Sequence, residues 1–233
     1  MSICWEEAIE ETMANNLLEA YSGDKAREYD MRRATSTRWR REVEAMQAIL
    51  DQVGPRSIVD CPFGTGRWIP QFEASGATVT GIDLSQNMLD EAVAKIAVLP
   101  ADRRGAYNLI CQSIFDIEPK TPRPDLTVCI RFLNWVTFSD VSRALRQLTA
   151  LGSPHMVVGA SLVPKSAGRL RRLWYRLSLA LINIRNKRNP IQYVHSEAEF
   201  LALIDQLGWK VISRREIMRR NARVNFFFLL GRL

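Results

Sequence analysis

Apolar residues recur along most of this chain in two patterns, a helical spacing and a short continuous run typical of buried strands. The helical spacing runs through Glu6 to Ala20 and through Arg38 to Val53, and Gly54-Pro55 ends the second helix. From residue 57 onward, short apolar runs alternate with helical stretches. This alternation predicts a parallel sheet that is covered by helices on both faces.

The predicted elements follow one another without a linker, which favours one α/β domain over residues 1–233. Strands are expected at 57–61, 78–83, 107–111, 125–131, 155–161, 209–217 and 224–230, and helices at 86–98, 140–151 and 196–207, with a further helix ending near 75. Ser196 and Glu199 are spaced as a capping box. Residues 1–37 are expected to form an N-terminal helical extension, and residues 162–195 a basic helical insertion after the fifth strand.

Composition narrows the class of protein. Apolar residues make up 47% of the chain and charged residues 24%, as in a globular protein with a core. The chain begins with acidic residues, so we expect no signal peptide. It has no run of about 18 apolar residues, so we expect no membrane span. The cysteines Cys4, Cys61, Cys111 and Cys129 show no CxxC pairing, so we expect a reduced cytoplasmic chain, and no metal site.

The formal net charge of +7 is concentrated in one segment. Eight basic residues and no acidic residue lie between Leu162 and Gln192, whereas the rest of the chain carries 24 basic against 25 acidic residues. On a helix, an apolar stripe would form from Leu170, Leu173, Trp174, Leu177, Leu181 and Ile184. Two interpretations stay open: a lid helix that packs this stripe on the domain, and a basic helix that lies on an anionic membrane surface.

The strand at 57–61 runs into a glycine loop, Pro62-Phe-Gly-Thr-Gly66, followed by a helix. Glycine lets the backbone approach a ligand closely, and the helix N-terminus offers unpaired N–H groups. Ile69 occupies the third glycine position of the dinucleotide fingerprint, which argues against NAD. Asp83 ends the next strand at the same crevice, where a carboxylate can accept both hydroxyls of a ribose.

Two motifs at this spacing, Asp60-x-x-x-Gly64-x-Gly66 and Gly81-x-Asp83-x-Ser85-x-x-Met88-Leu89, resemble those of the class I S-adenosylmethionine-dependent methyltransferases. The resemblance covers about residues 35–233. It implies a mostly parallel, seven-stranded Rossmann-like sheet whose last strand is antiparallel. It also implies S-adenosylmethionine as the cofactor and methyl transfer as the activity.

The same resemblance implies a set of cofactor-binding residues. The methionine end would be shaped by Asp60, Gly64 and Gly66, the ribose held by Asp83, and the adenine flanked by Leu84 and Met88. The full expected set is Asp60, Cys61, Pro62, Gly64, Gly66, Arg67, Asp83, Leu84, Met88, Ser113, Ile114 and Arg131. This chain departs from the family at Ser113, where an acidic residue often contacts the adenine amine, and at Pro62, where many members have the first glycine.

No catalytic residue follows from the sequence, because the cofactor carries the reactive group and the protein mainly supplies orientation. A side-chain base is needed only if the acceptor carries a proton at neutral pH. The acceptor-side candidates are Arg131, Tyr193 and His195, with Asn134 and Trp135 after the fourth strand, and with Tyr29, Arg32 and Arg33 from the N-terminal extension.

The function that the sequence favours is methyl transfer to a small-molecule or lipid-linked acceptor by a cytoplasmic enzyme. Peripheral contact with the anionic inner face of a membrane is expected if the insertion is the membrane-surface helix. The alternatives are an RNA methyltransferase that grips phosphates with segment 165–188, and a non-catalytic cofactor-binding protein. Nucleic acid is the less favoured partner, since no Asn-Pro-Pro-aromatic motif is present. The oligomeric state is left open.

Overall fold

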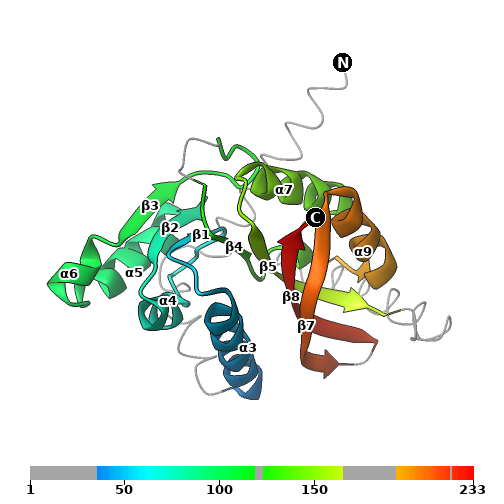
Figure 1. Cartoon of the computed structure of the whole chain (residues 1–233), viewed down its shortest axis with the longest axis horizontal. Helices are drawn as coiled ribbons and strands as arrows, with labels where there is room; N and C mark the ends of the chain where they lie inside the picture. The colour runs from blue at the N-terminus through cyan, green and yellow to red at the C-terminus, as the bar shows by residue number, and fades with distance from the viewer. Residues whose placement is uncertain (1–35, 119–122, 165–192, 221) are drawn as a thin grey trace.

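The computed structural model describes residues 36–118, 123–164, 193–220 and 222–233. Within them, one eight-stranded sheet has the order β3-β2-β1-β4-β5-β8-β7, and the short β6 pairs with β5 (Figure 1). The strands are β1 (Ser57–Asp60), β2 (Thr78–Asp83), β3 (Tyr107–Cys111), β4 (Leu126–Cys129), β5 (His155–Val163), β6 (His195–Ser196), β7 (Trp209–Arg220) and β8 (Arg223–Arg232).

The mostly parallel sheet with an antiparallel last strand is confirmed. Strands β1 to β5 pair in parallel, whereas β8 runs antiparallel to both β5 and β7. The difference from the predicted seven strands is β6, which pairs with Leu162 and Val163 of β5. Two residues carry too little hydrophobic pattern to be recognised as a strand from sequence.

Helices cover both faces of the sheet (Figure 1). One face is covered by α3 (Thr37–Val53), α4 (Ile69–Ser75) and α5 (Gln86–Ala97), and the other by α7 (Phe138–Ala150) and α9 (Glu197–Gln206). The short α6 (Ala101–Arg104) and the 3₁₀ turn η1 (Leu133–Trp135) complete the described helices. In β8, Phe226 and Phe228 pack toward α7 and α9, whereas Phe227 packs toward α3, which is the two-residue period of a strand buried on both sides.

Side-chain capping explains the start of α7 but not the start of α9. α7 begins two residues earlier than expected, because Thr137 and Asp140 form a reciprocal capping box. Ser196 is the N-cap of α9, but its side chain makes no capping hydrogen bond, so the capping box predicted with Glu199 is not formed. Ser196 is also the last residue of β6, where its backbone is paired with β5.

Most of the N-terminal extension (residues 1–35) and of the insertion (165–192) lies outside the described residues. The helix at Glu6 to Ala20, the roles of Tyr29, Arg32 and Arg33, and the apolar stripe of the insertion therefore stay predictions. The described ends of the insertion are adjacent, since β5 reaches Val163 and β6 resumes at His195 beside it. No helix among the described residues is long and apolar enough to cross a membrane.

Candidate functional site

The glycine loop joins β1 to α4 at the carboxyl edge of the sheet. Gly64 and Gly66 both have positive φ, of 58° and 68°. A Cβ at Gly66 would lie 2.5 Å from Ile69 Cδ1 and 3.2 Å from Ala92 Cβ, so glycine is required there for close packing on α5. A Cβ at Gly64 would meet no described atom within 4 Å. The loop is therefore packed at Gly66 and open at Gly64, where a ligand can approach the backbone.

Asp83 ties this loop to the end of β2. One carboxylate oxygen accepts the N–H of Gly64 at 2.7 Å, and the other accepts the N–H of Ser85 at 2.9 Å. Burial raises the pKa of the Asp83 carboxyl, although these backbone donors offset part of the effect. Each carboxylate oxygen can accept more than one hydrogen bond. Asp83 therefore organises the loop and keeps capacity for a ligand's hydroxyl groups.

Asp60 ends β1 and is only 1% exposed. Among the described residues, neither of its carboxylate oxygens has a hydrogen-bond partner. Burial, and secondarily the charge of Asp83, raises the pKa of the Asp60 carboxyl well above its ordinary value. Because a buried carboxylate without a partner is costly, Asp60 suits a ligand that brings a donor or a positive charge.

The expected adenine-side residues lie just after β2, in the first turn of α5, and just after β3, which is adjacent to β2 in the sheet. Leu84 is 38% exposed, an unusual position for a large apolar side chain, while Met88 and Ile114 are buried. The Ser113 hydroxyl accepts the N–H of Phe115 at 3.2 Å and so stabilises its own turn. In the same region, Cys111 is exposed, and its Sγ lies 3.5 Å from the Leu84 carbonyl.

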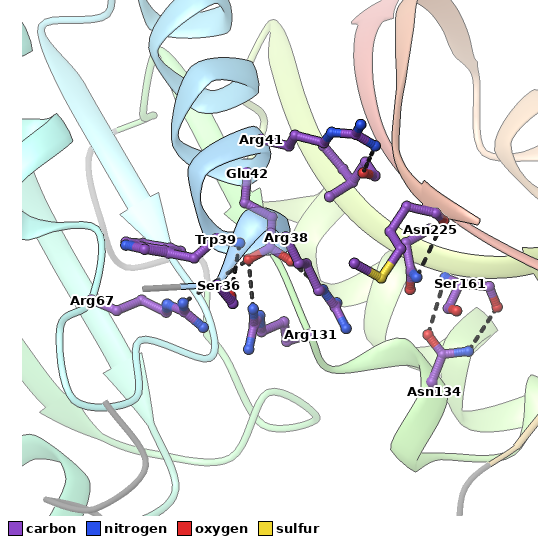
Figure 2. A network of polar contacts seen from close by, with 12 residues as sticks. Ser36, Arg38, Trp39, Arg41, Glu42, Arg67, Arg131, Asn134, Ser161 and Asn225 are labelled. Atoms are coloured by element: carbon purple, nitrogen blue, oxygen red, sulfur yellow. Dashed lines mark hydrogen bonds and ion pairs between the residues drawn. The ribbon is translucent and has the colours of Figure 1, made fainter. Parts of the chain in front are cut away.

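A charged cluster, which sequence analysis did not predict, joins α3 to this edge (Figure 2). Glu42 is fully buried, and its carboxylate contacts Arg38 at 2.8 Å, Arg131 at 2.5 Å and Arg67 at 4.0 Å. The Arg67 guanidinium also lies 3.9 Å from the ring centroid of Trp39. Arg67 and Arg131, which both belong to the expected cofactor-binding set, are thus brought together by one carboxylate of α3.

Arg131 follows β4 in an unusual backbone conformation. Its φ is 65°, and it is the one described non-glycine residue with positive φ. Such conformations cost roughly 1–3 kcal/mol and persist where the surroundings hold them, often at ligand sites. The ion pair with Glu42 holds the Arg131 side chain in place.

The other acceptor-side candidates are bound into the backbone. The Asn134 amide bonds both backbone groups of Ser161, accepting its N–H at 3.0 Å and donating to its carbonyl at 2.8 Å. Tyr193 donates its backbone N–H to the Asn134 carbonyl. His195 is buried, its Nε2–H donates to the Leu133 carbonyl at 2.7 Å, and burial lowers its pKa. His195 therefore connects η1 to β6.

A pocket lies beside Arg131, over the carboxyl ends of β4 and β5 and the start of β8. The space is small and partly open to solvent. Its lining residues are Arg38, Glu42, Ile130, Arg131, Asn134, Gly159, Ala160, Ser161, Asn225, Phe226 and Phe227. Arg131 and Asn134 are the candidates from sequence that line it, while Tyr193 and His195 are not among the lining residues.

The residues that sequence analysis missed left a weak signal. Glu42, Ala45, Met46, Ile49 and Leu50 are the buried residues of α3, so a charge stands on the predicted apolar stripe. Ser161 and Asn225 interrupt the apolar runs of β5 and β8. A polar residue on a buried face usually has a partner or a ligand, and this rule would have marked all three.

A glycine loop and a strand-end carboxylate at the carboxyl edge of a parallel sheet define a ligand-binding α/β protein of the Rossmann-like class. The comparisons with known proteins narrow this class. Residues 58–155 match a family described as methyltransferase domain. No curated protein matches the sequence of this chain.

Solved structures with the same fold include three methyltransferases. Magnesium protoporphyrin IX methyltransferase from Synechocystis PCC 6803, with bound S-adenosylmethionine, has a TM-score of 0.63 at 18% identity, over 94% of this chain and 90% of that chain. The 1,6-didemethyltoxoflavin-N1-methyltransferase of Burkholderia thailandensis has a TM-score of 0.65 at 15% identity, over 97% of this chain and 89% of that chain. Geranyl diphosphate C-methyltransferase from Streptomyces coelicolor A3(2) has a TM-score of 0.64 at 12% identity, over 82% of this chain and 79% of that chain.

The matched family and the fold agree with the resemblance found in the sequence. Residues 58–155 match the methyltransferase domain family, and the chain has the fold of the solved methyltransferases.

Proposed function

We propose that this chain transfers the methyl group of S-adenosylmethionine to a small-molecule acceptor that binds over β4, β5 and β8. The observation that carries the proposal is the adjacency of two sites on one sheet edge. The unpartnered Asp60 carboxylate and Asp83 lie at the ends of β1 and β2. The pocket beside Arg131 lies next to them, beyond the end of β4.

The residues on the β1–β2 side fit this cofactor. S-adenosylmethionine supplies a methyl group activated on a positively charged sulfur, and it also carries an ammonium group and two ribose hydroxyls. Asp83 would accept the ribose hydroxyls, and Asp60 would face the positive charge. Leu84, Met88 and Ile114 would flank the adenine, while the open side of Gly64 would admit the methionine portion.

The chain would contribute to the reaction mainly by orientation. An in-line displacement needs the acceptor atom aligned with the methyl group, and such alignment can contribute roughly 7–11 kcal/mol in favourable cases. Of the three catalytic candidates, Arg131 is the one that lines the pocket, so we assign it a part in holding the acceptor. His195 acts as a positioning residue, because its Nε2–H is engaged by the Leu133 carbonyl.

A small acceptor is supported by the compounds for which the three similar enzymes are named, which are magnesium protoporphyrin IX, 1,6-didemethyltoxoflavin and geranyl diphosphate. The proposal also includes a lipid-linked acceptor and contact of the basic insertion with a membrane. Both depend on residues 165–192, which lie outside the described residues.

The proposal is tested by incubating the purified full chain with methyl-labelled S-adenosylmethionine and an extract that is then fractionated into small-molecule, lipid, RNA and protein pools. We expect label in the small-molecule or lipid pool. Label confined to RNA or protein would overturn the proposed acceptor class. Calorimetry with S-adenosylhomocysteine is the independent test of cofactor binding.

A further inference from the structure

The glycine loop contains a turn that is closed by a backbone hydrogen bond. The Gly66 N–H donates to the Phe63 carbonyl at 3.2 Å, so Gly64 and Thr65 are the two central residues of the turn. Phe63 is attached to the sheet, because its N–H donates to the Ile82 carbonyl of β2 at 2.9 Å. The backbone therefore fixes where the turn begins, whereas its two central residues depend on other contacts.

Two charged side chains hold these central residues. The Gly64 N–H donates to the Asp83 carboxylate at 2.7 Å, and the Thr65 carbonyl accepts a hydrogen bond from Lys95 Nζ at 2.8 Å. Asp83 is the last residue of β2, whereas Lys95 lies in the last turn of α5. Hydrogen bonds with one charged partner are stronger than those between neutral groups. The turn is thus held from two different elements, by a carboxylate and by an ammonium group.

The helix that carries Lys95 also packs against the loop. Ala92 of α5 is fully buried, and a Cβ at Gly66 would lie 3.2 Å from its Cβ. Lys95 follows Ala92 by three positions, so the two side chains are neighbours on one side of the helix. Ala92 belongs to the same core cluster as Phe63. This packing fixes the place from which Lys95 reaches the loop.

The two glycines make such restraints valuable. Glycine has more backbone freedom than any other residue, so a loop with Gly64 and Gly66 loses much conformational entropy when it is ordered. A ligand that orders a loop on binding loses affinity by the cost of that ordering, and contacts that hold the loop beforehand remove part of the cost. The hydrogen bond from Lys95 to the Thr65 carbonyl is a contact of this kind.

We infer that Lys95 is a positioning residue for the cofactor. Its ammonium group holds the Thr65 carbonyl and so keeps the glycine loop in the conformation that receives the methionine portion of S-adenosylmethionine. Lys95 acts through Thr65 and need not contact the cofactor. The inference rests on the proposed function, since it assigns the loop to that portion of the cofactor. The alternative is a role in helix stability alone, because a cation in the last turn of a helix interacts favourably with the helix dipole.

Two ligands separate these roles. S-adenosylhomocysteine carries the amino-acid portion, whereas 5′-methylthioadenosine has the adenosine and the sulfur without it. Dissociation constants are measured by calorimetry on the full chain and on Lys95→Met, which keeps an unbranched apolar side chain and removes the ammonium group. We expect Lys95→Met to weaken S-adenosylhomocysteine by about five- to tenfold, the scale of one ordering cost. The affinity for 5′-methylthioadenosine should change by about twofold or less, because this ligand lacks the portion that the loop receives.

Two further variants control the comparison. Lys210→Met removes an exposed lysine of β7, the edge strand that β4, β5 and β8 separate from β1, and should leave both affinities unchanged. Lys95→Arg should bind S-adenosylhomocysteine more tightly than Lys95→Met, because it restores a cationic donor. Should Lys95→Met fail to fold, Lys95→Ala gives the same comparison, since alanine favours helix.

Hydrogen exchange measures the loop directly. Without ligand, the backbone amides of residues 63–66 should exchange faster in Lys95→Met than in the parent chain.

The inference is overturned if Lys95→Met binds S-adenosylhomocysteine as tightly as the parent chain, if it weakens both ligands equally, or if Lys210→Met causes the same loss. Unchanged affinity with a lower free energy of unfolding would assign Lys95 to helix stability alone. The proposed function is judged separately. If the parent chain and Lys95→Met bind S-adenosylhomocysteine equally, only the role of Lys95 is wrong, whereas absent binding to the parent chain contradicts the methyltransferase proposal itself.

Discussion

The two sides of the candidate site are built in different ways. On the cofactor side, the polar contacts are local: the Gly64 N–H and the Asp83 carboxylate that accepts it are 19 positions apart, in the loop after β1 and at the end of β2. On the pocket side, Glu42 and Arg131 are 89 positions apart and come from a helix and a strand end. Local motifs constrain a short loop, whereas the pocket depends on how α3 packs on the finished sheet.

This difference predicts which single substitution lowers the free energy of unfolding most. Glu42→Ala removes the carboxylate that Arg38, Arg67 and Arg131 share. Breaking a buried ion pair by removing one partner costs about 3–5 kcal/mol. We expect a loss of this size in the free energy of unfolding, measured by urea denaturation.

The control for Glu42 is Glu73, whose carboxylate pairs with Arg103 at 3.0 Å with 19% of its side chain exposed. Glu73→Ala should cost about 1 kcal/mol or less, because solvent screens this pair. Equal losses for the two variants would mean that the cluster on α3 is an ordinary surface network.

The second largest effect is expected on the cofactor side. Asp83→Ala should weaken S-adenosylhomocysteine binding by about 1.5–3 kcal/mol, the scale of hydrogen bonds to a charged group. Asp125→Ala is the matched control, because Asp125 also accepts two backbone N–H groups, of Arg56 and Ser57, but at the opposite end of β1. Calorimetry on both folded variants should show the loss for Asp83 alone, and an unchanged affinity would remove Asp83 from the site.

Sequence patterns predicted the glycine loop and the strands beside it, because these elements are defined by backbone demands. Gly66 has a positive φ of 68°, which favours glycine, and β1 and β2 have the short apolar runs that mark buried strands. The pocket side was predicted only through Arg131 and Asn134. Periodicity placed α3 as a helix, but it does not say which strand ends that helix crosses, so the meeting of Glu42 with Arg131 could not be foreseen.

His195 illustrates the same limit. A lone histidine before a helix was a reasonable catalytic candidate, and nothing in the sequence distinguishes a catalytic role from a structural one. The separation comes from its burial and from the Leu133 carbonyl that its Nε2–H meets, both of which depend on how β6 returns beside β5.

A pH-dependent effect should distinguish Asp60 from the pocket residues. The pKa of its carboxyl is raised in the folded chain by burial, so its ionisation opposes folding, and stability is lost as the pH rises above the unfolded-state value. Asp60→Asn should therefore be more stable than the parent chain at neutral pH without ligand, with the difference vanishing in acid. The same variant should bind S-adenosylhomocysteine more weakly. Thermal unfolding between pH 4 and 8 measures the first effect, and a pH-independent difference would contradict the burial argument.

The smallest expected effect is the most informative about the pocket. Ser161→Ala removes a hydroxyl that has no partner among the described residues, so no hydrogen bond is lost in the folded chain and one polar group need no longer be buried. Its free energy of unfolding should stay within about 0.5 kcal/mol of the parent value or rise slightly. Ser153→Ala breaks the bond to Thr127 and leaves that buried hydroxyl unpaired, at a cost of about 1–3 kcal/mol. A Ser161 variant as unstable as the Ser153 variant would mean that the Ser161 hydroxyl already has a structural partner and is not available to an acceptor.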